Sequence, residues 1–122
     1  MLGHLSFGVK DLVRAAAFYD AVLAPLGFVR VWDTAKGVGY GPQGGNDKLA
    51  LFPVETPVAP GAGFHLAFDA PDREAVDGFH AAALAAGGAD LGAPGLRPRY
   101  GETYYAAFVR DPDGHKLEAV HQ

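Results

Sequence analysis

Hydrophobic and polar residues alternate along residues 2–9, which is typical of a strand with one buried face. Leu5 and Phe7 lie on one side of this strand, and His4 and Ser6 lie on the other. If a helix covers the Leu/Phe side, the His/Ser side is left for solvent or for a ligand.

A helix is expected directly after this strand. Asp11 predicts its start, because an aspartate carboxylate accepts the free N–H groups of a first helical turn. Pro25 and Gly27 predict its end. The expected apolar stripe of this helix consists of Val13, Ala17, Phe18, Ala21 and Val22.

The rest of the chain is divided into short elements by glycine, proline and Asn-Asp turns. Strands are expected near 27–33, 37–41 and 47–53 in the first half, and near 64–69, 104–110 and 115–121 in the second. A second helix is expected from about Asp72 to Ala86, where Gly87 and Gly88 stop it. The pattern for a strand near 89–92 is weak.

The two halves of the chain are copies of one pattern. Residues 3–27 and 64–88 align without gaps and are identical at nine of 25 positions. The matches that composition does not explain are His4 with His65, Phe7 with Phe68, and Asp11 with Asp72. We therefore predict an α+β fold, a single domain over residues 1–122 built from two βαβββ modules of about 1–55 and 62–122. The modules are expected to form a curved mixed sheet around a cleft, with the helices outside.

Composition narrows the functional classes. The chain has 122 residues, a net charge of −4 and no cysteine, which excludes disulfides, thiolate catalysis and sulfur-bound metals. No basic stripe suits a nucleic acid, and no apolar run is long enough for a membrane. No signal peptide precedes the first strand, so a cytoplasmic location is expected.

Candidate chemistry falls on one side of the strands. His4, His65 and Glu118 each lie opposite the core-facing residues of their strand, and the two histidines occupy equivalent repeat positions. Two imidazoles and a carboxylate suit one divalent cation such as Zn²⁺, Ni²⁺, Mn²⁺ or Fe²⁺. Three protein ligands leave positions open for water or substrate, as in catalytic sites. Glu118 is then both a ligand and the candidate catalytic base.

Simpler interpretations compete with each of these assignments. A lone histidine on a strand is more often a surface or hydrogen-bonded residue than a ligand, and Glu118 alone would be a solvated strand residue. The sequence DPDG at 111–114 predicts a turn rather than a calcium site, because it lacks the further oxygen ligands of such a loop. His80, His115 and His121 are assigned no chemistry.

Two stretches of the chain resemble a known superfamily. HLSFGVKDLVRAAAFYDAVLAPLGF near the start and FVRDPDGHKLEAVH near the end look like the opening and closing segments of vicinal oxygen chelate proteins. This superfamily includes glyoxalase I, extradiol dioxygenases, fosfomycin-resistance transferases and bleomycin-resistance proteins. GLRPRYGETYYAAFVRDPDGHKLEAV also resembles a single-domain glyoxalase-like branch.

The resemblance implies metal ligands on the first and last strand of each module. It selects His4, His65 and Glu118, whereas the fourth position is Ala50, which cannot bind a metal. A His-His-Glu set is similar to that of extradiol dioxygenases and fosfomycin-resistance transferases. The remaining substrate-binding candidates are Arg97, Arg99, Tyr100, Tyr104, Tyr105, Ser6 and Phe52, with space for the substrate beside Ala50.

Three functions follow from this set. The first is a metal-dependent glyoxalase-like lyase or isomerase that holds a small substrate through two adjacent oxygens. The second is an extradiol-type dioxygenase or a fosfomycin-resistance-like transferase. The third is a non-catalytic, bleomycin-type binding protein. A homodimer is expected, with the metal site either within one chain or shared between two subunits.

Overall fold

The computed structural model describes residues 1–122 and contains eight strands, two α-helices and one short 3-10 helix. The first module consists of β1 (Leu5–Val9), α1 (Leu12–Leu23), η1 (Ala24–Leu26), β2 (Phe28–Thr34), β3 (Gly37–Pro42) and β4 (Leu49–Pro53). The second consists of β5 (Leu66–Asp69), α2 (Arg73–Ala85), β6 (Ala89–Leu96), β7 (Tyr105–Arg110) and β8 (Lys116–His121). The α+β class and the repeated βαβββ order are thereby confirmed.

Each module forms its own four-stranded mixed sheet, with strand orders β1-β4-β3-β2 and β5-β8-β7-β6. The internal repeat extends to strand register. Ser6 pairs with Ala50 between the parallel strands β1 and β4, and Ala67 pairs with Glu118 between β5 and β8. Ala50 and Glu118 therefore occupy equivalent places, as the resemblance to the superfamily implies.

Both helices begin where the sequence predicts. The Asp11 carboxylate accepts a hydrogen bond from the Arg14 amide at 3.1 Å, and the Asp72 carboxylate accepts one from the Ala75 amide at 2.7 Å. Each helix is followed by a glycine in the left-handed region, Gly27 after η1 and Gly87 after α2. These positive φ angles explain why glycine stands at both stops.

The buried face of α1 differs from the expected stripe. Val13 is 83% exposed and Ala17 is also exposed, so neither belongs to the core. The buried residues of α1 are Ala15, Ala16, Phe18, Tyr19, Val22 and Leu23. The reason is that α1 packs against α2 as well as against its own sheet. Its buried face therefore differs from the stripe expected for a helix that packs on one sheet alone.

The strand with the weak pattern is longer than expected, since β6 runs over Ala89–Leu96. Its pairing with β7 shifts register on both sides of Gly92, and β6 lies at the edge of its sheet. Bulges interrupt the alternation of side chains and so weaken the strand pattern in the sequence.

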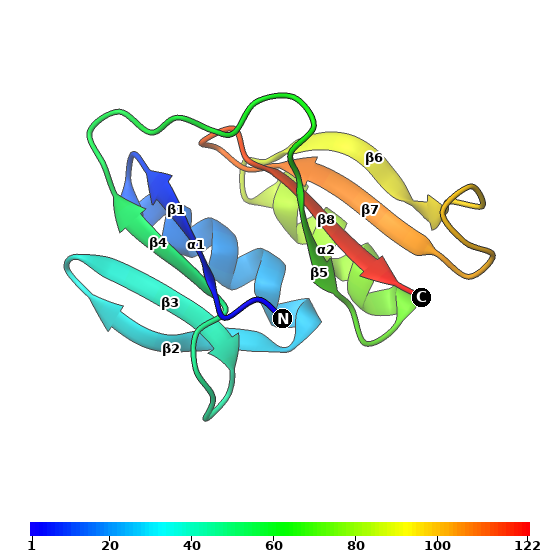
Figure 1. The fold of residues 1–122 in the computed structure, drawn as a ribbon, viewed down its shortest axis with the longest axis horizontal. Coiled ribbons are helices and arrows are strands. Elements are labelled where there is room, and N and C mark those ends of the chain that lie inside the picture. The colour runs from blue at the N-terminus through cyan, green and yellow to red at the C-terminus, as the bar shows by residue number, and fades with distance from the viewer.

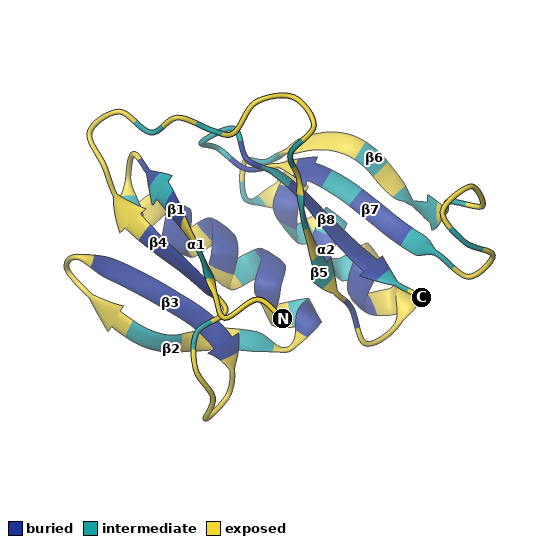
Figure 2. Ribbon diagram, viewed as in Figure 1, coloured by how far each residue is buried: buried dark blue, intermediate teal, exposed yellow.

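The helices cover one face of both sheets. Figure 1 shows the two sheets side by side with α1 and α2 behind them, and no strand of one sheet is hydrogen-bonded to a strand of the other. A single core cluster of 22 buried residues extends through both modules. Figure 2 shows that burial concentrates on the helices and central strands, whereas the linker between β4 and β5 is exposed. No helix is long and apolar enough to cross a membrane.

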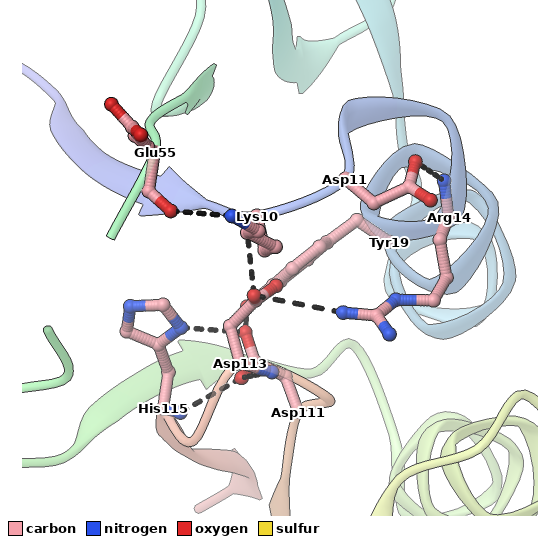
Figure 3. Close-up of polar contacts among 8 residues, drawn as sticks. All are labelled: Lys10, Asp11, Arg14, Tyr19, Glu55, Asp111, Asp113 and His115. Carbon is pink, nitrogen blue, oxygen red and sulfur yellow. Dashed lines mark hydrogen bonds and ion pairs between the residues drawn. The ribbon is translucent and has the colours of Figure 1, made fainter. Parts of the chain in front are cut away.

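A buried polar cluster also joins the modules (Figure 3). It centres on the DPDG turn between β7 and β8, which the sequence predicts as a turn. Asp111 accepts a hydrogen bond from the Tyr19 hydroxyl of α1 at 2.6 Å, and its carboxylate lies 2.7 Å from Nδ1 of His115. Asp113 accepts a hydrogen bond from the Lys10 amide at 3.0 Å. The turn of the second module is therefore held against the start of the first helix.

Candidate functional site

Two of the predicted metal ligands lie together on the second sheet. Alternation along β8 places Glu118 on the face away from α2, and His65 approaches the same face from just before β5. Nε2 of His65 and Oε2 of Glu118 are 2.8 Å apart and share a hydrogen bond. The Glu118 side chain is 1% exposed and that of His65 is 42% exposed, so the imidazole lies between solvent and a buried carboxylate.

Tyr104 holds the other oxygen of the same carboxylate. Its hydroxyl donates a hydrogen bond to Oε1 of Glu118 at 2.5 Å. Burial, and then the hydrogen bond to the Glu118 carboxylate, raise the pKa of Tyr104 to about 12. The phenol therefore remains a hydrogen-bond donor at neutral pH. Glu118 is fixed at both oxygens, which orients it toward the space in front of the sheet.

That space is a pocket of about 980 Å³, a volume suited to a small molecule. Its lining residues are His65, Leu91, Gly92, Leu96, Arg97, Pro98, Arg99, Tyr100, Tyr104, Phe108, Lys116 and Glu118. Of the predicted substrate-binding residues, Arg97, Arg99, Tyr100 and Tyr104 thus line the same pocket as the His65–Glu118 pair.

Tyr105 lies on the opposite face of the sheet. Its hydroxyl donates a hydrogen bond to Oδ1 of Asp77 in α2 at 2.7 Å, and the Arg73 guanidinium lies over its ring. The hydrogen bond to Asp77, together with burial, raises the pKa of Tyr105. The adjacent tyrosines point in opposite directions because successive strand side chains alternate, and the structure does not bring Tyr105 to the pocket.

The other predicted residues belong to the first sheet. Ser6 and Ala50 are register partners, and Phe52 follows two positions along the same face. Phe52 is 40% exposed, and its ring lies 6.0 Å from that of Trp32. Because Gly39 has no side chain, Trp32 lies close over the sheet, where an added Cβ would be 2.1 Å from its Nε1 atom. The first sheet presents an aromatic surface rather than a polar pocket.

His4 is exposed and precedes β1 on this first sheet. It does not join His65 and Glu118 within one chain, because the chain contains no group of three His, Cys, Asp or Glu side chains placed to hold a metal ion. One chain therefore supplies two candidate ligands. Their donor atoms face each other at 2.8 Å, an ordinary hydrogen-bond separation, and would need to open to about 3 Å or slightly more to bind a common ion through bonds of about 2.0–2.1 Å.

Sequence reasoning missed two features of this region. Lys116 stands two positions before Glu118 and therefore shares its face of β8, so strand alternation alone contained the signal for this pocket residue. His115, which was assigned no chemistry, is 2% exposed and bonded to Asp111. A histidine in a turn carries no local signal of burial.

The arrangement of paired βαβββ modules is that of the vicinal oxygen chelate class. The profile of the Glyoxalase/Bleomycin resistance protein/Dioxygenase superfamily matches residues 1–119. The chain belongs to this superfamily, as the two sequence segments indicate. No curated protein matches it.

One solved structure supports the same assignment, and two others share the fold. A glyoxalase/bleomycin resistance protein from Albidiferax ferrireducens is 35% identical, with 98% of this chain and 96% of that chain covered and a TM-score of 0.82. A glyoxalase-related enzyme from Fulvimarina pelagi is 22% identical, with coverage of 98% and 86% and a TM-score of 0.75. The fosfomycin resistance protein FosX from Mesorhizobium loti is 20% identical, with coverage of 100% and 92% and a TM-score of 0.73. The last two likenesses show the fold alone.

Proposed function

We propose that this protein is a metal-dependent, glyoxalase-like lyase or isomerase that holds a small substrate through two adjacent oxygens. The observation that carries the proposal is the pairing of His65 with Glu118 at 2.8 Å on the wall of the pocket. Tyr104 supports it, because a carboxylate held by a neutral hydroxyl is oriented without being neutralised by a cation.

The third ligand in this proposal is His4 of a second copy of the chain, in a homodimer. Two facts favour a shared site. His4 is exposed on the first sheet, and the two sheets of one chain lie side by side rather than face to face (Figure 1). The set of two imidazoles and one carboxylate suits Zn²⁺, Ni²⁺, Mn²⁺ or Fe²⁺. When bound, such an ion acts as a Lewis acid on the two substrate oxygens.

Glu118 is the proposed base. It takes a proton from the substrate carbon beside the bound oxygens and returns it to the neighbouring carbon, so the isomerisation is balanced in protons and electrons. Tyr104 fixes Oε1 of this carboxylate during both transfers, and His65 contacts Oε2. Phe108 and Leu96 in the pocket lining exclude part of the surrounding water.

Metal analysis combined with a hemithioacetal turnover assay tests the activity. The wild-type protein is expected to bind one divalent ion per site and to turn over the substrate, and Glu118→Gln is expected to lose metal or activity. The matched control is Glu74→Gln, an exposed carboxylate in the first turn of α2. Oxygen uptake with catechols in the presence of Fe²⁺, without hemithioacetal turnover, would instead indicate a dioxygenase.

Subunit mixing tests the shared site. His4→Ala and Glu118→Gln are each expected to be inactive alone. In a mixed dimer, one of the two sites receives an intact His4 from one subunit and an intact Glu118 from the other, so activity should return. A mixed dimer that remains inactive would show that the ligands come from one chain or that no such site forms.

A non-catalytic binding protein is the second candidate function. The specific observation in its favour is that one chain alone presents only two candidate metal ligands. It predicts a monomer or dimer that binds a small molecule without metal, and that His4→Ala and His65→Ala leave this binding intact. Equilibrium dialysis with the small molecule measures its binding to each variant. Comparing both variants with metal-free wild-type protein separates this candidate from the enzyme.

A further inference from the structure

Three positive side chains line the pocket without a carboxylate partner. Arg97, Arg99 and Lys116 take part in none of the ion pairs of the structure. Glu118 is the only acidic residue in the pocket lining, and its oxygens are already held by His65 and Tyr104. The pocket is therefore locally positive, although the chain has a net charge of −4.

Arg97 is fixed in place without being neutralised. Its Nη1 donates a hydrogen bond to the Gly95 carbonyl at 2.9 Å, and its Nη2 donates one to the Ala93 carbonyl at 2.8 Å. Both acceptors are uncharged, so no negative group offsets the charge of the guanidinium. Its other N–H groups remain free to bind a ligand. The guanidinium lies close over two glycines, since a Cβ at Gly92 or Gly95 would lie 3.2 Å from a guanidinium nitrogen and would shift it slightly.

Lys116 and Arg97 both lie over the same aromatic ring, that of Phe108. The Lys116 Nζ lies 5.3 Å from the centre of the Phe108 ring, and the Arg97 Cζ lies 5.6 Å from the same centre. Phe108 is the register partner of both Gly92 in β6 and Glu118 in β8. This pairing places the two cations beside the His65–Glu118 pair on the same face of the sheet.

We propose that Arg97 and Lys116 form an anion-binding subsite that takes a carboxylate or phosphate group of the ligand. A planar, pre-positioned guanidinium binds two oxygens of such a group, and the ammonium adds a second positive charge. The subsite itself does not depend on the proposed function. The inference rests on that function only where it assigns the bound anion to the substrate. The substrate class is then a small anionic molecule whose charged end lies near Phe108 and whose reacting oxygens lie at His65 and Glu118.

Inorganic phosphate titrated into the metal-free protein, followed by NMR at the Gly92 and Gly95 amides, tests the subsite. Arg97→Gln and Lys116→Gln are each expected to weaken phosphate binding by about tenfold. Lys36→Gln removes an exposed charge from the β2–β3 turn and should leave binding unchanged. Arg97→Lys retains the charge and should lose less affinity than Arg97→Gln. Thermal unfolding of each variant verifies that it is folded.

The subsite would be overturned if the wild-type protein did not bind phosphate, or if the Arg97→Gln, Lys116→Gln double variant bound phosphate as tightly as wild type. It would also be overturned if Lys36→Gln lost as much phosphate affinity as Arg97→Gln or Lys116→Gln. Metal binding measured on the same samples separates the two proposals. Loss of phosphate binding in the Arg97 and Lys116 variants supports the subsite even if the wild-type protein takes no metal. Conversely, these variants could bind metal, turn over the substrate and bind phosphate as tightly as wild type. That result would support the proposed enzyme and contradict the subsite.

Discussion

Tyr19 and Asp111 are 92 positions apart in the chain, yet the Tyr19 hydroxyl donates a buried hydrogen bond of 2.6 Å to the Asp111 carboxylate. Tyr19 belongs to the helix of the first module and Asp111 to the last turn of the second (Figure 3). Burial, and then the neighbouring carboxylate, raise the pKa of Tyr19 well above its ordinary value. The contact is therefore a neutral donor held on a charged acceptor, and it connects the two halves of the duplication.

Removing this hydroxyl should destabilise the protein. A hydrogen bond to a charged group contributes about 1.5–3 kcal/mol, so Tyr19→Phe is expected to lower the free energy of unfolding by about that amount. Urea unfolding at neutral pH measures the change. Tyr105→Phe is the control, because it removes an exposed hydrogen bond to Asp77 and should have a much smaller effect. Equal stability of Tyr19→Phe and wild type would contradict the role assigned to this bond.

Asp111 should also make stability depend on acidity. Burial acts to raise its pKa, but the hydrogen bonds from His115 and Tyr19 outweigh burial and hold the pKa below its ordinary value of 3.8. The unfolded chain thus binds a proton more readily at this carboxyl than the folded chain does. The resulting stabilisation is fully present above about pH 4 to 5 and is lost as pH falls through the folded pKa.

Thermal unfolding of wild type and Asp111→Asn from pH 7 to pH 3 measures this dependence. The variant should be less stable at pH 7, and the difference between the two proteins should shrink toward pH 3. Comparing the two proteins cancels the titration of the other carboxylates. A difference that stayed constant over the whole range would show that Asp111 titrates alike in the folded and unfolded states.

Tyr104 should affect metal binding more than stability. In the proposed site its hydroxyl orients Glu118, and removing such an orienting partner costs about 10-fold to 100-fold in metal affinity in known metal sites. Tyr104→Phe is expected to show a loss of this size in calorimetric titration with Zn²⁺. Tyr100→Phe is the matched control, since Tyr100 lines the same pocket but its hydroxyl is hydrogen-bonded to Arg99 rather than to Glu118. Equal affinities would place Tyr104 outside the metal site.

Gly88 should not tolerate a side chain. An added Cβ would lie 2.9 Å from the carbonyl oxygens of Ala83 and Arg110 and from the Phe18 ring, so it is confined by backbone on two sides. Gly88→Ala is expected to cost about 1–3 kcal/mol of unfolding free energy. Gly61→Ala, in open space in the linker, should be near neutral. Chemical denaturation of both variants tests this, and a neutral Gly88→Ala would mean that the local backbone yields.

The sequence predicts the fold well because local signals agree with tertiary packing. Asp11 and Asp72 mark both helix starts, and the resemblance to the superfamily implies that Ala50 and Glu118 occupy equivalent positions. The buried face of α1 is predicted less well, since Val13 is exposed while Tyr19 is buried. The packing of α1 against α2 decides this, and no local pattern encodes a second helix.

The candidate site is predicted in part for a similar reason. Alternation places His65 and Glu118 on one face, and the structure brings them within hydrogen-bonding distance. Nothing local to Tyr104 and Tyr105 predicts which of them reaches the pocket, because that choice depends on where β7 begins. The position of His4 relative to the His65–Glu118 pair depends on how the sheets of the two modules are arranged. Strand periodicity does not predict that arrangement.

The continuous core has a consequence for the history of this duplicated chain. Phe18 of α1 and Phe79 of α2 belong to one apolar cluster, so each half supplies part of the interior of the other. If the two halves were separated, each would expose a large apolar surface to water, and each is too small to bury that surface alone. The nine identities between the halves indicate a duplication, and a half-length precursor would have needed a second molecule to bury the same apolar surface.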